Sequence, residues 1–593
     1  MGRLRLGLAA VAALAAYDGS CWADEPRASV QGVQDRALRQ AIERYIGATA
    51  RPPHSRFEAR QRAEQAAEDA AVVLRSEGYY DYAVTPDITE GDAPKPVVRI
   101  DIGPRSLIAD PTVGWAGEAP DPKAAADALK ALSLPPGGPG RAADVIAAEG
   151  RVVGALERDG YADAKADPRE VVVDHTDHTV RPAFRVDPKL RVRLDGVQVK
   201  TTGRTNPRWV AHLAPWRTGQ FYSPEAVAEL ERRLLDTGVY NSVTVSLAPV
   251  SNAQGLRPVI VSLSDRPHSS LSLSGSYATK EGVGADARYS IYNALGRADT
   301  ITLNAQYGSI LKRLDLDLSL PHWRRPRLTL DVGATAYQDD TTAFRERDAG
   351  VHVDLQQRFA KTSFRTLGLS ADYSDDNEKM LVNGQIVGVR QNLALLTGLG
   401  RLSLDHSNDV LDPTRGWRFD GRVEPTFGTG DATLAYAKLD LQASAYLPFN
   451  ASGATVLAGR LRMGSILTGG ATFDIPASRR FYAGGGGSIR GFGYQAVGPR
   501  FPDNTPIGGL SLVETSLELR QRFGSRLGGV LFVDAGTVGD QKYPNFKSFS
   551  TGVGVGVRYN LGFGPLRADI GVPVNRRTGD APFQIYISIG QSF

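Results

Sequence analysis

In the second half of the chain, hydrophobic and polar residues alternate along a series of short segments. The clearest lies at 313–320, where Leu314, Leu316 and Leu318 alternate with charged or hydroxyl-bearing side chains. A period of two predicts a β-strand with one apolar and one polar face. Lipid outside and water inside is the environment that such opposed faces suit in a membrane barrel.

Segments of this kind recur from His268 to the end of the sequence. Their count is about 16, the even number expected of a bacterial outer-membrane barrel. The predicted strands start near residues 268, 282, 298, 312, 326, 347, 363, 391, 415, 434, 454, 510, 528, 549, 564 and 582. A soluble β-sandwich would rarely need so many uniform strands. We therefore expect residues 267–593 to form an all-β transmembrane barrel of antiparallel strands, with an internal loop at about 468–507.

The first half repeats one pattern about every 80 residues. A helix-like segment ends at Gly78, at Gly160 and at Gly238, each followed within two residues by tyrosine. Glycine at these positions predicts a left-handed helix cap. Strand-like runs follow each cap, and a second helix candidate precedes it. The repeat predicts three small α+β units at 24–103, 104–187 and 188–266, each with one strand, two helices and two strands. Three generic α+β domains without a binding role are the alternative.

The N-terminus carries Arg3 and Arg5, an apolar run and a possible cleavage point after Ala23. This pattern predicts a secretory signal peptide at 1–23. Cys21 raises the possibility of lipidation, but Asp18-Gly19-Ser20 lacks the apolar residue of a lipobox. Because Cys21 is the sole cysteine, the mature chain would contain no disulfide. No later apolar run is long enough for a membrane helix, which leaves a periplasmic protein or a barrel.

Composition excludes several other functions. The net charge of +4 is small for 593 residues and gives no reason to expect nucleic acid. The eight histidines are scattered and no G-x-S-x-G motif is present, which argues against an outer-membrane lipase. No cluster of His and Cys has metal-ligand spacing, so neither a metal nor a cofactor is expected. The chain is therefore not expected to be an enzyme.

The predicted internal loop contains the stretch R-R-F-Y-A-G-G-G-G-S-I-R-G-F at Arg479–Phe492. The glycines Gly484, Gly485, Gly486 and Gly487 predict a flexible loop that folds tightly. No Lys-Ser/Thr follows the run, so it does not match a phosphate-binding loop. A large loop that presents one arginine among barrel strands predicts a plug or latch inside the lumen.

Three α+β units, a 16-stranded barrel and the motif Ile489-Arg490-Gly491-Phe492 together resemble the superfamily of outer-membrane assembly and secretion proteins that combine POTRA units with a barrel. The resemblance implies that Arg490 reaches into the lumen and pairs with acids on neighbouring strands. Asp534 matches the family's F-x-D-x-G pattern, and Glu514 on the preceding strand is a second candidate partner. A bidentate arginine–carboxylate pair would fix the loop in one register.

Within that superfamily, three POTRA units and the segment Leu404–Gly416 are similar to the TamA-like assembly factors. This resemblance implies an outer-membrane barrel with its POTRA domains in the periplasm. It implies insertion of unfolded autotransporters and other β-barrel substrates, and a TamB-like protein that spans the periplasm as partner. It also implies a poorly sealed lateral seam between the first strand, about 269–278, and the last, 583–593. Gly275 and Gly590 would weaken packing at that seam, and Phe593 resembles a terminal aromatic signal.

A passive outer-membrane secretion pore or plugged porin, of the two-partner-secretion type, is the competing hypothesis. In that protein the loop would only plug the lumen.

Overall fold

The computed structural model describes residues 25–593 except 50, 92, 279–281, 383–384, 545, 547, 562–563, 590 and 592. The predicted signal peptide therefore lies outside the described residues. By internal packing the chain divides into two compact units: Met1–Gly196 with Trp216–Val227 and Ala248–Pro258, and Val197–Pro215 with Ala228–Leu247 and Val259–Phe593. None of the helices described is both long and apolar enough to cross a membrane.

The sheet of the first α+β unit has the order β2-β5-β4, with β5 parallel to β2 and antiparallel to β4. The Asp35 carboxylate caps the first helix by accepting hydrogen bonds from Ala37 N and Leu38 N. Leu38, Ile42 and Ile46 lie on one face of that helix and are buried. The elements are β1 (Glu25–Pro26), β2 (Ser29–Gln31), α1 (Arg36–Ile46), β3 (Ala48–Thr49), α2 (Arg56–Ser76), β4 (Ala83–Ile88) and β5 (Pro96–Asp101).

The second and third units have a similar order of strands and helices along the chain. The second is arranged around β10, and the third has the order β11-β13-β12. The elements are β6 (Leu107–Ile108), β7 (Thr112–Trp115), α3 (Pro122–Leu132), α4 (Ala142–Arg158), β8 (Lys165–Ala166), β9 (Glu170–Asp174), β10 (Thr179–Asp187), β11 (Arg193–Thr201), α5 (Pro207–His212), α6 (Pro224–Leu235), β12 (Tyr240–Leu247) and β13 (Leu256–Asp265). Gly78, Gly160 and Gly238 have φ of 91°, 101° and 72°, the left-handed conformation expected after each helix.

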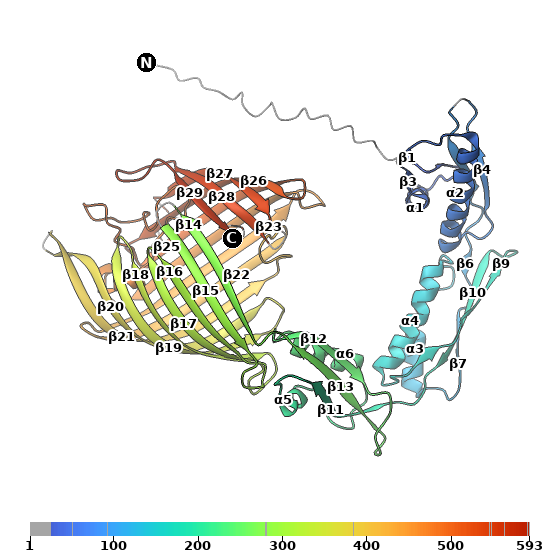
Figure 1. The fold of residues 1–593 in the computed structure, drawn as a ribbon, viewed down its shortest axis with the longest axis horizontal. Helices are drawn as coiled ribbons and strands as arrows, with labels where there is room; N and C mark the ends of the chain where they lie inside the picture. The colour runs from blue at the N-terminus through green and yellow to red at the C-terminus, as the bar shows by residue number, and fades with distance from the viewer. Residues whose placement is uncertain are drawn as a thin grey trace. The chain divides into compact units, whose positions relative to one another are not determined.

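Within the described part of the chain, sixteen strands form one closed antiparallel barrel, and Figure 1 shows its first strand, β14, beside the last strands of the chain. The strands are β14 (Ser269–Ala278), β15 (Gly282–Tyr292), β16 (Thr300–Gly308), β17 (Leu311–Leu320), β18 (Leu328–Asp340), β19 (Phe344–Arg358), β20 (Phe364–Val382), β21 (Gln385–Asp405), β22 (Gly416–Gly430), β23 (Leu434–Pro448), β24 (Thr455–Thr468), β25 (Ser511–Phe523), β26 (Leu527–Gly539), β27 (Ser550–Asn560), β28 (Pro565–Pro573) and β29 (Gln584–Ile589). The predicted fold class, an α+β region followed by this barrel, is confirmed.

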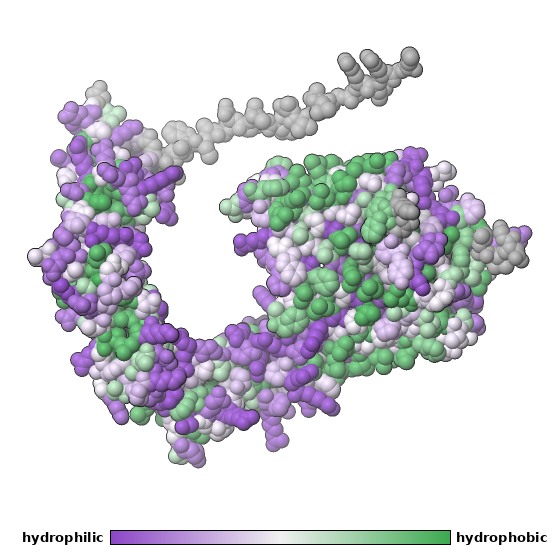
Figure 2. All heavy atoms as spheres, turned by 180° about the vertical axis from the view of Figure 1, so that it is seen from behind, coloured by the Kyte–Doolittle hydropathy of each residue, from purple (hydrophilic) through white to green (hydrophobic). Residues whose placement is uncertain are grey.

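The alternation seen in the sequence matches the two faces of the barrel wall. Leu314 and Leu316 are half exposed, at 49% and 52%, whereas Asp315 between them is buried. Asp315 accepts hydrogen bonds from Arg313 and Thr335. Figure 2 shows hydrophobic side chains gathered over the outer face of the strands. The outer leucines therefore suit lipid, and the inner polar residues suit a wet lumen.

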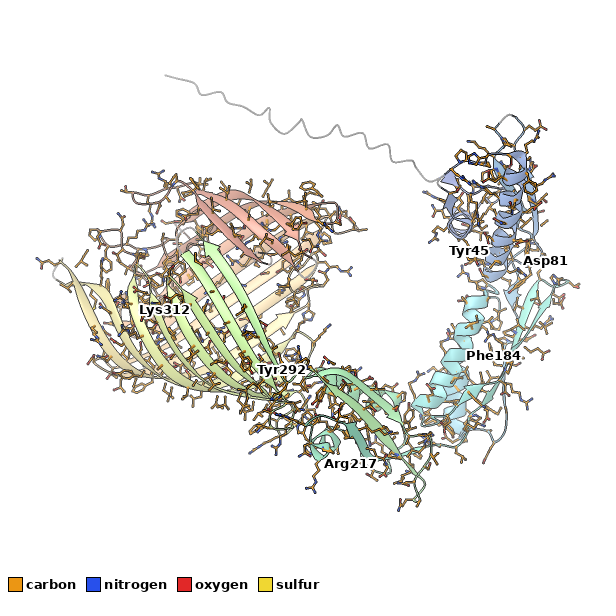
Figure 3. All side chains as sticks on the ribbon, in the orientation of Figure 1. Tyr45, Asp81, Phe184, Arg217, Tyr292 and Lys312 are labelled. Carbon is orange, nitrogen blue, oxygen red and sulfur yellow. The ribbon has the colours of Figure 1, made fainter. Side chains whose placement is uncertain are left out.

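The barrel begins at the end where the third sheet connects to it. Figure 3 labels Tyr292, the last residue of β15. Its hydroxyl forms a 2.9 Å hydrogen bond with the Ser270 hydroxyl, and its ring lies under the Arg266 guanidinium. Because the strands are antiparallel and β14 starts at this end, every second turn lies at the same end, beginning with the turn after β15. The 406–416 turn and the end of β29 therefore lie at the end of the barrel that carries the third sheet.

Replacing Leu316 by arginine should destabilise the barrel by about 2–4 kcal/mol, because the charge would face the hydrocarbon layer. Thr302→Arg is the matched control, since Thr302 lies on the inner face opposite Asp317 and should tolerate the same side chain. Urea unfolding in lipid vesicles measures both. Equal losses in the two variants would show that the two faces are wrongly assigned.

Candidate functional site

The loop between β24 and β25, residues 469–510, packs inside the barrel. It contains two short 3₁₀ turns, η1 (Thr472–Asp474) and η2 (Ala477–Arg479). Ile489 and Phe492 are fully buried in an apolar cluster with Leu395, Tyr436 and Leu512 of the wall. The loop is therefore part of the barrel's core, and we call its tip, Ile489–Phe492, the latch.

Arg490 is the centre of the latch and its side chain is 2% exposed. Its Nε and Nη2 donate to the two oxygens of Asp534 on β26, at 2.7 and 2.9 Å. Its Nη1 lies 2.7 Å from Glu518 on β25 and 3.0 Å from Asp569 on β28. The pairing with Asp534 is the one that the sequence resemblance implies, and it is bidentate.

The latch carboxylates are themselves shared with wall arginines. Arg520 lies 2.8 Å from Glu518, and Arg558 and Arg567 both approach Asp569. Glu518 and Asp569 thus each have a second cationic partner, whereas among the described residues Arg490 is the one cation paired with Asp534. The Arg490 guanidinium also lies 3.5 Å from the centre of the Phe532 ring, where a planar cation stacks well.

Glycines on the wall make room for the latch backbone. A Cβ at Gly552 would come within 1.8 Å of the Arg490 carbonyl oxygen, and one at Gly571 within 2.7 Å of Gly491 N. Gly491 itself has φ of 99° and would clash with the Val572 backbone if it carried a side chain. Close approach of two backbones thus requires glycine on both sides.

The last strand also holds the latch. The Tyr586 hydroxyl on β29 accepts a 3.2 Å hydrogen bond from Gly491 N and donates a 3.0 Å bond to Phe492 O. The latch therefore contacts β25, β26, β28 and β29 through side chains, and β27 through Gly552. These five strands, which we call the C-terminal wall, are braced by a single loop.

Glu514 requires a correction, because it is not a partner of Arg490. Its carboxylate accepts a hydrogen bond from Ser488 and lies 3.9 and 3.6 Å from Arg460 and Arg462. Glu514 and Glu518 share the inner face of β25, and the arginine reaches the wall nearer to Glu518. The sequence pattern identifies that face but not the level along the strand.

The glycine run before the latch is packed rather than loosely placed. Gly484 and Gly485 have φ of 106° and 103°, and Gly484 N donates a 2.9 Å hydrogen bond to Ser488 Oγ. A Cβ at Gly486 would come within 2.8 Å of the Tyr586 ring, whereas Gly487 has open space. Three of these four glycines are thus required by backbone angle or by close contact.

A second anchor lies at the base of the loop, and the sequence analysis did not include it among the site residues. Arg480 is 2.6 Å from Glu378 on β20, and both side chains are almost fully buried. Its other nitrogens donate to Ile475 O at 2.7 Å and Ile507 O at 3.0 Å, one on each leg of the loop. Arg479 lies 2.8 Å from Glu346 and from Asp348 on β19. The paired arginines before Phe481 were the available sequence signal.

The lateral seam between β14 and β29 is weakly paired. In the described residues these strands pair at two positions, Tyr277↔Ile587 and Ala278↔Tyr586. Across the other edge of β14, ten residue pairs join it to β15. Gly275 lies in β14 opposite Ala285 of β15 and is not paired with β29 within the described part of the chain, and the predicted seam residue Gly590 falls outside the described residues.

The last strand is shorter than the predicted 583–593, because β29 ends at Ile589. Gln591 and Phe593 instead contact groups of the lumen and of the 406–416 turn. The Phe593 ring lies 6.4 Å from the Tyr446 ring, and Arg520 donates to Phe593 O at 3.3 Å. The expectation that Phe593 belongs to the seam strand is therefore wrong for this conformation.

The sequence analysis missed Glu518, Asp569 and Tyr586 as latch contacts. All three are inner-face residues of the last five strands, and their alternation with exposed apolar residues was the only signal available. No group of three or more His, Cys, Asp or Glu side chains among the described residues is arranged to hold a metal ion.

Replacing Arg490 by alanine should destabilise the barrel by about 3–5 kcal/mol, because it leaves buried carboxylates short of one positive charge. Denaturant unfolding in detergent micelles measures this loss. Arg401→Ala removes a bidentate pair with Asp420 that is one-third exposed, and should cost about 0.2–1 kcal/mol. The double exchange Arg490→Glu with Asp534→Arg should not restore stability, since Glu518 and Asp569 would face the new carboxylate. Full restoration would contradict the shared network.

Arg480→Ala should free the base of the loop while the latch stays docked. We expect faster protease cleavage within residues 469–480 and larger fluctuations of single-channel conductance in planar bilayers. Arg390→Ala is the control, because Arg390 pairs with Asp375 between β20 and β21 and does not hold the loop. Unchanged cleavage and conductance in Arg480→Ala would show that the second anchor is dispensable.

Comparison with known proteins identifies the family. The Omp85 superfamily domain matches residues 293–593, more than half of the chain. Outer membrane protein assembly factor BamA from Neisseria meningitidis serogroup B is 21% identical over 594 residues, which covers 90% of this chain and 73% of that protein. A SAM50-like protein from Drosophila melanogaster is 24% identical over 350 residues, covering 56% of this chain and 77% of that protein.

Among solved structures, BamA from Haemophilus ducreyi lacking POTRA domains 1–3 superimposes with a TM-score of 0.67 at 19% identity. The match covers 81% of this chain and 99% of that one, and it shows the same fold. Because the family domain covers more than half of the chain, including the barrel from β16 onward and the latch, this chain belongs to the Omp85 superfamily.

Proposed function

We propose that this chain is an outer-membrane assembly factor that helps to insert other β-barrel proteins. The observation that carries the proposal is the seam, where β14 and β29 pair at two positions among the residues that the structure describes. An unpaired strand edge within lipid has no water to satisfy its backbone groups. An incoming strand could pair with that edge by β-augmentation, and its own backbone groups would be satisfied at the same time.

The geometry of the wall supports the same function. The strands at and beside the seam are short, with β14 of 10 residues, β28 of 9 and β29 of 6. The strands across the barrel are long, with β20 of 19 residues and β21 of 21. A short hydrophobic wall favours local thinning of the bilayer, which lowers the cost of inserting a strand beside the seam.

The latch gives the seam one fixed side. Arg490 and Tyr586 tie the last five strands together, so β29 is held by the loop as well as by β28. No such loop contact braces β14 within the described residues. Opening of the seam is therefore expected to move β14 and its neighbours relative to a stationary C-terminal wall, β25 to β29.

We further propose that autotransporters are among the substrates and that the three α+β units act as POTRA domains in the periplasm. A TamB-like protein that spans the periplasm is the proposed partner. The name of the meningococcal relative, an assembly factor, supports the general role. The TamA-like assignment rests on the three units at 24–103, 104–187 and 188–266 and on the segment Leu404–Gly416.

A disulfide across the seam tests the proposal. Tyr277→Cys with Ile587→Cys places two cysteines at paired positions. Because Cys21 lies within the predicted signal peptide, no other thiol is expected to compete. Oxidation should abolish surface display of an autotransporter, and a reductant should restore it.

Leu273→Cys with Ala287→Cys is the matched control, since it staples β14 to β15 at a boundary that need not open. This variant should display the substrate normally when oxidised. If the seam staple also leaves display intact, the assembly function fails and the passive secretion pore becomes the better hypothesis.

A further inference from the structure

The turn between β21 and β22, residues 406–416, is held rigid by its own side chains. Asn408 Oδ1 accepts hydrogen bonds from Thr414 N and Arg415 N, each at 3.0 Å. Asp409 Oδ1 accepts from Leu411 N and Asp412 N, each at 2.8 Å. Such local bonds fix the backbone of a turn. Asp412 is thereby presented in one position at the end of the barrel where β29 finishes.

Gln591 binds this turn through its backbone and its side chain. Its N donates to Leu411 O at 3.3 Å, and its Nε2 donates to Asp412 Oδ1 at 3.0 Å. Its Oε1 accepts from Arg558 Nε at 2.9 Å. Arg522 pairs with the other oxygen of Asp412 and so holds the carboxylate toward Gln591. Both polar atoms of the Gln591 side-chain amide, Oε1 and Nε2, are thus hydrogen-bonded.

Phe593 provides the second contact of the same segment. Its ring stacks on Tyr446 with an interplanar angle of 25°, and the guanidinium groups of Arg460 and Arg520 lie 5.5 and 5.1 Å from its centre. The ring borders a lumenal cavity of about 610 Å³. The arginines attract the face of an aromatic ring, so the site selects an aromatic residue.

The same segment is the natural partner of the unpaired part of β14. If β29 continued in the register of Tyr277↔Ile587, Gln591 would lie opposite Leu273 and Phe593 opposite Leu271. Strand alternation would then turn Phe593 outward, toward the lipid interface, because Ile587 faces outward with 42% exposure. The turn and β14 therefore compete for Gln591 and Phe593, and these residues cannot occupy both positions.

We propose that the 406–416 turn is a clasp for Gln591 and Phe593, and that it sets the extent of pairing across the seam. With Gln591 and Phe593 in the clasp, the seam is limited to the observed pairs. With the clasp released, β29 can lengthen along β14 and close the seam. This inference deepens the proposed function by assigning a control element to the same seam, and it gives the segment Leu404–Gly416 a role.

The clasp can be tested in the full-length protein in liposomes, without any substrate. Gly275→Cys with Ile589→Cys reports closure, because these positions would pair next on the same face if the β14–β29 pairing continued in register beyond Tyr277↔Ile587. Asp412→Ala removes the acceptor in the turn, and Phe593→Ala removes the aromatic anchor without altering the turn. Each should raise the initial rate of disulfide formation about tenfold, as expected for the loss of one or two hydrogen bonds or an equivalent contact.

Arg415→Ala is the matched control, because it removes an exposed charge from the same turn and should leave the rate unchanged. Heat-modifiable gel mobility confirms that each variant is folded. Unchanged or lower rates in both Asp412→Ala and Phe593→Ala would overturn the clasp. Autotransporter display measured in the same variants separates the two claims: faster closure with normal display would retain the clasp and count against the assembly function of the seam.

Discussion

Burial of one guanidinium against the carboxylates of the barrel wall is the interaction on which the rest of this structure depends. Arg490 brings Asp534, Glu518 and Asp569 to a common point, and those residues belong to three different strands. An isolated carboxylate at this depth would be strongly disfavoured. The loop is therefore required for the stability of the inner wall, and the wall in turn fixes where the loop can lie.

The consequence is a barrel in which some strands are braced by the loop and others are not. The strands from β25 to β29 share the latch, and β19 with β20 share the second anchor through Glu346 and Glu378. The strands from β14 to β17 are short and contact neither anchor in the described residues. The weakly paired seam thus joins β29, which the latch holds through Tyr586, to β14, which neither anchor contacts in the described residues.

Much of this fold could be predicted because its strands carry a period of two over many repeats. The leucines at 314 and 316 and the glycine caps at 78, 160 and 238 carry local signals that tertiary structure does not alter. Asp534 could be found because its motif is linear. Asp569 and Tyr586 could not, because their relation to Arg490 depends on strand register and on the level that the loop reaches. The shortened last strand was missed for a related reason, since Gln591 and Phe593 are compatible with a strand and only the lumen contacts divert them.

The position of the loop along the chain has a consequence for how the barrel itself is built. The partners of Arg479 and Arg480 lie upstream, on β19 and β20, whereas every strand that contacts Arg490 lies downstream. A chain delivered from its N-terminus can therefore dock the base of the loop early, and Ile489 and Phe492 can join Leu395 and Tyr436 of earlier strands. The Arg490 side chain, however, has no carboxylate partner until the final strands arrive. Completion of the buried charge network is then the last step of biogenesis, so a truncated or stalled chain would carry an uncompensated arginine that marks it as unfinished.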